Sequence, residues 1–320
     1  MNISARIRRF SSIMLIALSS AWSFSWSVLA AEVEQTPYIF VLGVVQDAGY
    51  PQSGCYLPHC MPGWEDPALR RGATCISLID PAAKQKWLFE ATPNFPDQLY
   101  RLHEEAPDDE FSLSGIFLTH AHIGHYAGLM FLGHESMGAS GVPVYAMPRM
   151  HEYLKENGPW SQLVNYKNIE LRALENNKAV TTASSEVTPF LVPHRDEYSE
   201  TVGYRLSGPN KSALFIPDIN KWADWDQDIA ELVKGVDYAL LDAAFFDHGE
   251  LPGRDMSKIP HPFVKETMDA LQELTQAEKN KVWFIHMNHT NPLLKFDSPE
   301  AAEVRAAGYN IATEGTRLPM

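Results

Sequence analysis

The chain has 320 residues, of which 45% are hydrophobic and 21% are charged, and its formal net charge at pH 7 is −14. This composition fits one large globular domain or two small ones, and no long polar linker divides the chain. We expect no binding to nucleic acid, because lysine and arginine contacts with phosphates supply most non-specific affinity and an acidic protein repels a polyanion. A local basic pocket for a small phosphorylated substrate is compatible with this charge.

Residues 1–31 have the pattern of a secretory signal peptide. Three arginines within the first nine residues precede an apolar run over residues 13–18, and the segment ends in Ala30 and Ala31. We therefore predict cleavage after Ala30 or Ala31 and a periplasmic or secreted location. The alternative is an uncleaved membrane anchor, but the serines between residues 19 and 27 make a poor hydrocarbon span, so we expect no stable membrane insertion after cleavage. Cleavage would remove three arginines and no acidic residue, which takes the net charge from −14 to −17.

For residues 32–320 we predict a single domain in which strands and helices alternate. The predicted strands cover residues 38–45, 75–79, 87–90, 115–118, 142–146, 169–173, 189–193, 213–217, 238–241 and 282–285. The predicted helices cover residues 95–103, a segment from about residue 126, and residues 150–156, 226–234, 262–274 and 299–307. Residues 46–51 read as a turn-rich loop after the first strand.

Three histidines lie within six residues directly after the predicted strand at 115–118. They are His120, His122 and His125, and an apolar helix is predicted to follow them. Neutral imidazole is the commonest protein ligand for zinc and related metals. A surface loop with incidental histidines is the alternative, but solvated histidines do not usually follow a buried strand and precede an apolar helix. The segment therefore predicts a metal site.

Three further predicted strands end in a side chain that can bind a metal. His194 follows residues 189–193, Asp218 follows residues 213–217, and His286 follows residues 282–285. Any one of these is more often a cap or a hydrogen-bonded polar group. Four such strand ends in one chain indicate loops that build a common site over the edge of a sheet.

The histidine loop, residues 119–125, resembles the HxHxDH metal-binding loop of the metallo-β-lactamase superfamily, and the later ligands follow in that superfamily's order. The resemblance implies an α/β fold, a four-layer αββα sandwich. It also implies a first metal bound by His120, His122 and His194, a second bound by His125 and His286, and Asp218 as the bridge. Gly124 stands where the superfamily has its aspartate, so we expect the second metal to lack a carboxylate and to bind weakly. On the same grounds, Gly124→Asp is expected to tighten its binding if the loop accepts a side chain.

Within that superfamily the chain resembles the pyrroloquinoline-quinone biosynthesis protein B family and the related cyclic phosphodiesterase of phosphonate catabolism. The resemblance rests on residues 42–55, 91–94 and 284–292 together with the histidine loop. It implies a metal-bound hydroxide that attacks an ester, phosphodiester or lactone in a small-molecule substrate, with Asp218 and His286 as catalytic residues and Asp218 orienting the nucleophile. One or two zinc ions are expected, with iron or manganese as alternatives. The competing functions are an iron-dependent oxidative enzyme of the biosynthesis protein B type and a non-catalytic metal-binding accessory protein.

The cysteines offer a second metal site. Relatives in the phosphodiesterase branch bind a structural zinc, and the resemblance matches Cys55, Cys60 and His289 to three of its ligands, with His59 as a possible fourth. The rival interpretation is a disulfide between Cys55 and Cys60, which is reasonable in an exported protein. Cys75, in a predicted strand, is expected to be a buried apolar residue.

Some other side chains near the ligand-bearing loops are weaker candidates. The aromatic residues there could line a substrate pocket, although aromatic residues in loops more often serve packing; they are Tyr126, Trp160, Tyr198, Trp222 and Trp225. Asp242, His248 and His261 are candidates for supporting the metal ligands or for acid catalysis.

Overall fold

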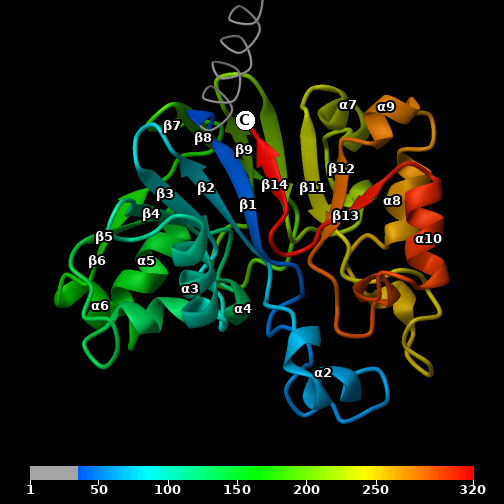
Figure 1. Ribbon diagram of the computed structural model, residues 1–320, viewed down its shortest axis with the longest axis horizontal. Helices are drawn as coiled ribbons and strands as arrows, with labels where there is room; N and C mark the ends of the chain where they lie inside the picture. Colours follow the sequence, from blue (N-terminus) through cyan, green and yellow to red (C-terminus); the bar gives the residue numbers. More distant parts are fainter. Residues whose placement is uncertain (1–34) are drawn as a thin grey trace, which may run out of the picture. The chain divides into compact units, whose positions relative to one another are not determined.

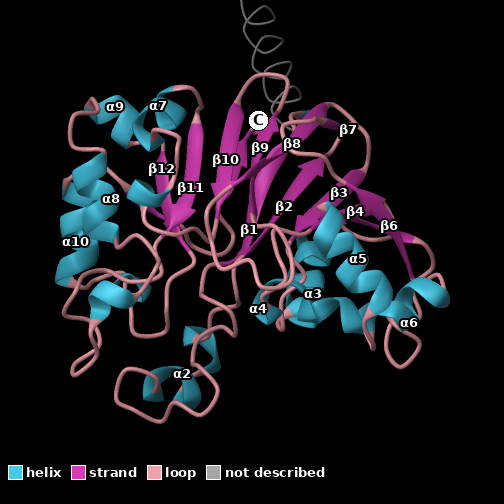
Figure 2. Ribbon diagram, turned by 180° about the vertical axis from the view of Figure 1, so that it is seen from behind, coloured by secondary structure: helices cyan, strands magenta, loops and turns pink. Residues whose placement is uncertain are grey.

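Two seven-stranded sheets with helices on their outer faces make up the unit formed by Thr36–Met320. The structure is a computed structural model that describes residues 35–320, and the predicted signal peptide at residues 1–31 lies outside the described residues. Figures 1 and 2 show the two sheets in the middle and helices on either side of them. The predicted α/β class and αββα layering are therefore confirmed.

The first sheet joins an antiparallel half to a parallel half. Its strand order is β14 (Arg317–Pro319), β1 (Tyr38–Gly43), β2 (Cys75–Asp80), β3 (Gln85–Phe89), β4 (Ser112–Phe117), β5 (Val142–Ala146) and β6 (Ile169–Ala173). The pairs from β14 to β3 are antiparallel and those from β3 to β6 are parallel. The histidine loop follows β4, at the edge where the parallel strands end.

The second sheet has the same division. Its strand order is β13 (Asn310–Ile311), β12 (Val282–Ile285), β11 (Tyr238–Asp242), β10 (Ser212–Ile216), β9 (Val202–Ser207), β8 (Ser185–Leu191) and β7 (Val180–Thr182). The pairs from β10 to β13 are parallel, and those from β7 to β10 are antiparallel. Because the carboxyl ends of parallel strands meet at one edge, Asp218 after β10 and His286 after β12 are delivered to the same side.

Both faces of each sheet are buried, which explains the continuous apolar runs in the strands. Along β1, Ile39 and Val41 belong to the core between the sheets, whereas Phe40 and Leu42 pack under the helices on the other face. This is the two-residue alternation of a strand. Between the sheets, the Phe89 ring lies 5.0 Å from the Phe117 ring, to which it is stacked.

The helices divide between the two outer faces. The first sheet is covered by α3 (Phe95–Glu105), α4 (Ile123–Tyr126), α5 (Pro148–Glu156) and α6 (Trp160–Asn165). The second is covered by α7 (Ile229–Lys234), α8 (Val264–Ala270) and α10 (Pro299–Ala306), while α9 (Gln276–Lys279) follows α8. The short helix α2 (Met61–Glu65) lies in the long connection between β1 and β2. Among the described residues, none of the helices combines the length and the apolar character needed to cross a membrane.

The structure differs from the predicted elements mainly after the histidine loop. A helix was expected from about residue 126, but α4 begins at Ile123 and a 3-10 helix over Ala127–Leu132 follows it. This segment packs closely on a neighbouring loop, since a Cβ on Gly128 would lie 2.2 Å from the carbonyl oxygen of Thr92. Strands β7, β9, β13 and β14 were not predicted, and of the helix expected over residues 262–274 only α8 forms.

Candidate metal centre

The structure brings the strand-end residues together in two adjoining clusters. His120, His122, His194 and Asp218 form one cluster, in which the possible ligand atoms all lie within 4.8 Å of one another. Three of these four side chains are buried, and the His122 side chain is 18% exposed. The carboxyl ends of strands from both sheets therefore build one polar site in an otherwise apolar interior.

The atoms of the first cluster have the spacing that a single cation requires. The Nε2 atom of His120 lies 2.8 Å from Nδ1 of His122, which lies 3.2 Å from Nε2 of His194. The Oδ2 atom of Asp218 lies 3.1 Å from Nε2 of His194 and 3.3 Å from Nε2 of His120. Ligand atoms about 2.0–2.2 Å from a tetrahedral metal lie roughly 3.3–3.6 Å apart, so the observed separations are equal to this spacing or up to about 0.5 Å shorter. The four side chains thus fit one divalent cation.

A hydrogen-bond chain sets the orientation of His120. Thr119 Oγ1 donates to Oε1 of Glu90 over 2.5 Å and lies 2.8 Å from Nδ1 of His120. A hydroxyl that donates to the carboxylate must accept from His120 Nδ1–H, which leaves the lone pair on Nε2 for a metal. Burial and the nearby His125 hold the pKa of His120 well below its usual value, so this ring is neutral, the form that binds metals.

The second cluster contains His125 and His286 together with a residue that the sequence did not reveal, Asp47. The Nε2 atom of His125 lies 3.5 Å from Oδ1 of Asp47 and 3.6 Å from Oδ2 of Asp218. Asp218 therefore faces both clusters, as the resemblance implies for a bridging residue. From Gly124 we expected the second cluster to lack a carboxylate of its own. The structure corrects this expectation, because the Asp47 carboxylate lies in the cluster.

Asp242 and His261 form a further group of possible metal ligands together with Asp218 and His286. The Nδ1 atom of His261 lies 2.8 Å from Oδ2 of Asp242 and 3.2 Å from Oδ1 of Asp218. Asp242 is fully buried and also accepts hydrogen bonds from the backbone N–H groups of Ile219 and Ala244. Burial opposes a charge on His261, but Asp242 and Asp218 outweigh it and raise its pKa to about 9. Of the three supporting residues considered from the sequence, these two lie at the site.

His248, the third, lies elsewhere. Its side chain is 59% exposed, with Nε2 3.7 Å from Oε1 of Glu266. The aromatic candidates mostly serve packing: the rings of Tyr126 and Trp160 are buried and lie 4.9 Å apart, and Trp222 lies 6.3 Å from Trp225. Tyr198 is exposed, with its ring 5.5 Å from that of Tyr153.

The four residues proposed for a structural zinc also meet in the structure. Possible ligand atoms of Cys55, His59, Cys60 and His289 lie within 4.8 Å of one another. The Cys55 sulfur lies 3.3 Å from Nε2 of His59, and both Cys55 and Cys60 are free thiols. The geometry therefore fits a zinc site and contains no disulfide. Cys75 is buried in β2, as expected.

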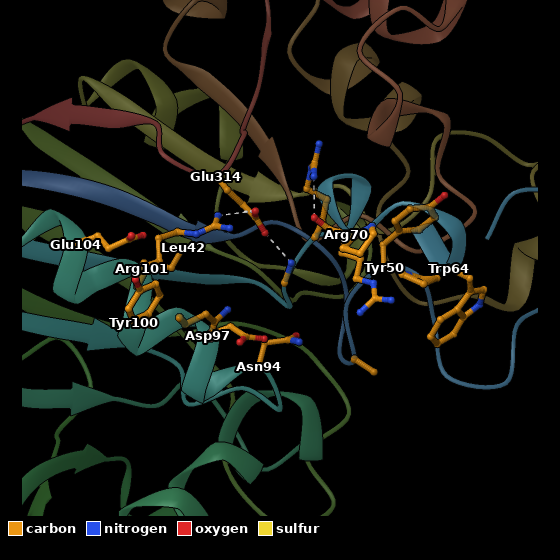
Figure 3. Close-up of a pocket in the computed structure, with 16 residues that line it drawn as sticks. Leu42, Tyr50, Trp64, Arg70, Asn94, Asp97, Tyr100, Arg101, Glu104 and Glu314 are labelled. Carbon is orange, nitrogen blue, oxygen red and sulfur yellow. Dashed lines mark hydrogen bonds and ion pairs between the residues drawn. The ribbon is translucent and has the colours of Figure 1, made fainter. Parts of the chain in front are cut away.

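A cavity of about 490 Å³ lies beside the loop that carries Asp47 (Figure 3). Arg70, Arg71 and Arg101 are among its lining residues, but none of the residues in the two metal clusters lines it. Its charge is partly neutralised, because Arg101 pairs with Glu314, which also accepts a hydrogen bond from the backbone of Gly72. The cavity therefore lies near the metal clusters but does not contain them.

Comparisons with known proteins agree with this geometry. The family model described as a beta-lactamase superfamily domain matches residues 85–287. Coenzyme PQQ synthesis protein B from Xanthomonas campestris pv. campestris is 26% identical over 307 residues, which cover 88% of this chain and 99% of that protein. The protein of the same name from Pseudomonas syringae pv. tomato is 27% identical over 317 residues, covering 88% of this chain and all of that protein, 100%.

Two solved structures share the fold. The 1.98-Å crystal structure of Zn²⁺-bound PqqB from Methylobacterium extorquens has a TM-score of 0.73 at 20% identity and covers 88% of this chain and 100% of that chain. A diphosphatase from the PhnP family has a TM-score of 0.62 at 22% identity and covers 89% of this chain and 97% of that chain. These comparisons confirm the family resemblance inferred from the histidine loop and the flanking motifs.

Proposed function

The chain belongs to the beta-lactamase superfamily, and on that premise we propose that it is an exported metal-dependent hydrolase that cleaves an ester, phosphodiester or lactone bond in a small molecule. The observation that carries the proposal is the complete cluster of His120, His122, His194 and Asp218. These residues would hold a divalent cation, which would lower the pKa of a bound water to about 7 and so supply hydroxide near neutral pH.

The surrounding residues can hold and orient the reactants. Asp218 presents Oδ2 to the histidines, and its Oδ1 lies 3.2 Å from Nδ1 of His261, so histidines lie on both sides of its carboxylate. A carboxylate at this place can accept a hydrogen bond from the attacking water and so orient it toward the substrate. His286 is completely buried, with Nδ1 3.6 Å from Oδ1 of Asp242.

Zinc is the metal that we propose for the first cluster, with iron or manganese as alternatives. Three imidazoles and one carboxylate suit zinc, and the structurally similar PqqB from Methylobacterium extorquens is a Zn²⁺-bound protein. We also propose that Cys55, His59, Cys60 and His289 bind a structural zinc, because two thiols and two imidazoles are a common tetrahedral set.

A second candidate function follows from the similarity to Coenzyme PQQ synthesis protein B, which extends over 88% of this chain. It is an iron-dependent oxidative reaction of that protein's type, since a histidine-rich site also suits iron. The predicted signal peptide argues against a role in cofactor biosynthesis, whose intermediates are expected in the cytoplasm. A non-catalytic accessory role is less well supported, because an idle site has little reason to keep three histidines and Asp218.

The experiment that separates these functions is the metal content of the purified mature protein, combined with a substrate screen and an oxygen electrode. Zinc or manganese together with cleavage of a phosphodiester, lactone or ester supports the hydrolase. Iron with oxygen uptake and no hydrolysis supports the oxidative enzyme. His194→Ala should abolish either activity, whereas His151→Ala, which changes a histidine of α5 outside both clusters, is the matched control.

A further inference from the structure

We propose that Asp47 is a ligand of a second active-site metal and supplies, from the loop after β1, the carboxylate that the histidine loop lacks at Gly124. The inference rests on the metal centre of the proposed function and assigns a role to a residue far from the histidine loop in the sequence. The second metal would then be held by Asp47, His125 and His286, with Asp218 next to His125.

The spacing of the side chains fits a shared cation. Oδ1 of Asp47 lies 3.5 Å from Nε2 of His125, and possible ligand atoms of Asp47, His125 and His286 all lie within 4.8 Å of one another. A separation of 3.5 Å is too long for a good hydrogen bond, but it is the separation expected of two atoms bound to one tetrahedral metal. Asp218 lies beside this group, with Oδ2 3.6 Å from the same Nε2.

The two histidines are already oriented for a ligand. Their rings are buried, with 2% of His125 and 0% of His286 exposed, and each has its Nδ1 atom toward a fully buried carboxylate. Glu90 Oε1 lies 3.3 Å from Nδ1 of His125, and Asp242 Oδ1 lies 3.6 Å from Nδ1 of His286. None of the four ring nitrogens of these two histidines has a hydrogen-bond partner within the described part of the chain. Buried polar atoms are rarely left unpaired, and a carboxylate behind a histidine is the usual support for a metal-binding ring.

Gly124 is the residue that allows Asp47 to approach. A Cβ on Gly124 would lie 2.5 Å from Cα, 2.8 Å from the carbonyl oxygen and 2.9 Å from Cβ of Asp47. Two of these atoms belong to the backbone and the third is bonded directly to it, so none can move away as the end of a flexible side chain could. A side chain at position 124 and the observed position of Asp47 therefore exclude each other. Glycine at position 124 leaves the space in which Asp47, from the loop after β1, reaches the cluster.

The backbone holds Asp47 and His286 together. The N–H of Gln46 donates to the carbonyl oxygen of Met287 over 2.9 Å, and the N–H of Met287 donates to Val44 over 2.9 Å. The immediate neighbours of the two proposed ligands are thus paired with each other. Asp47 and His286 also have left-handed backbone conformations, with φ of 47° and 67°. Non-glycine residues adopt such conformations at a cost in free energy, and they cluster at functional sites.

The experiment is a competition titration of the metal-free protein with cobalt or zinc against a chelator, which measures each dissociation constant without any substrate. Asp47→Asn keeps the size of the side chain and tolerates the left-handed backbone, but it removes the charge. It should weaken the second active-site metal at least tenfold and leave the first unchanged. A third equivalent at the cysteines is identified by its thiolate-to-cobalt absorption band. Asp109→Asn, an exposed aspartate in the loop after α3, is the matched control.

A second variant tests the same contact from the other side. Gly124→Ala leaves the Asp47 carboxylate in the chain but displaces it, so it should weaken the second metal as Asp47→Asn does. Unchanged affinity for both metals in both variants would overturn the assignment of Asp47. If binding of the second metal depends on Asp47 but no substrate is hydrolysed, the proposed function is wrong and the ligand assignment stands. If substrate is hydrolysed but metal binding does not depend on Asp47, the ligand assignment is wrong and the proposed function stands.

Discussion

Thr119 donates a hydrogen bond to the fully buried carboxylate of Glu90 over 2.5 Å. The same oxygen of Glu90 lies 3.3 Å from Nδ1 of His125, and the Thr119 hydroxyl lies 2.8 Å from Nδ1 of His120. One carboxylate is therefore linked to His120 of the first cluster through Thr119 and lies beside His125 of the second. The two proposed metals should respond together to a change at this residue.

Glu90→Gln is expected to weaken both active-site metals, by about 10–100-fold each, because an amide oxygen supports the imidazole less strongly than a carboxylate does. The measurement is the pair of dissociation constants from chelator competition. Glu273→Gln, which changes an exposed glutamate, is the control. A lower melting temperature with unchanged metal affinities would show that Glu90 serves stability alone.

The two clusters should contribute unequally to activity. His120→Ala or His194→Ala removes a ligand that faces the first cluster, and we expect activity to fall to the level of the metal-free protein. His125→Ala leaves the first cluster complete and should retain a measurable fraction. Initial rates at saturating metal, with metal content measured in the same samples, test this order. Greater loss in His125→Ala than in His194→Ala would contradict it.

Cys60→Ser should remove one equivalent of zinc and lower the free energy of unfolding, because a structural zinc contributes directly to folding. Metal binding at the active site should persist in the folded fraction. Metal analysis and urea unfolding test both effects, with Cys75→Ser as the control, since Cys75 is a buried cysteine outside the cluster. If oxidised and reduced chains differed in mass by two protons, a disulfide would replace the zinc assignment.

Glu250 should make the protein less stable as the pH rises through the range from about 4.5 to 7. Burial raises the pKa of Glu250 to about 7, although hydrogen bonds from Thr290 and the backbone of Phe246 oppose the shift. The folded protein thus retains a proton that the unfolded chain releases, and stability is lost up to a limit of about 3 kcal/mol. Between pH 5 and pH 7.5, the free energy of unfolding of the wild type should fall relative to that of Glu250→Gln. A difference that does not change with pH would contradict this role.

Export is expected to yield a mature chain that begins at Ala31 or Glu32. The basis is the arrangement of arginines, apolar run and small residues within residues 1–31. Cell fractionation followed by mass spectrometry of the intact protein tests it. Full-length protein confined to the cytoplasm would disprove the predicted location.

The sequence predicted the residues that lie at strand ends better than those placed by contacts between distant segments. The runs before His120, Asp218 and His286 are apolar and short, so their periodicity marks both the strand and the ligand after it. Strand β9 was missed because it contains Gly203, and glycine is uncommon within strands. The structure shows why glycine is needed there, since a Cβ would lie 2.7 Å from the Phe190 ring.

Asp47 was missed for a related reason. The superfamily pattern directs attention to position 124, whereas the carboxylate comes from a loop that reads as a simple turn. The expectation that Gly124→Asp would tighten the second metal is not supported by the structure, because the Asp47 backbone fills the space that the new side chain needs. The obstacle is occupied volume and not backbone conformation, and no local sequence pattern contains that information.

The contact between Gly124 and Asp47 has a consequence for the evolution of this protein family. Because a Cβ at position 124 would collide with the backbone at position 47, a side chain at position 124 requires the first loop to take a different course. Descendants of a common ancestor should therefore fall into two groups: those with glycine at the position of 124 and an acidic residue at that of 47, and those with aspartate in the histidine loop and a different course of the first loop. Passing from one group to the other would require both positions to change, so intermediates should be rare, and the pair should covary across an alignment.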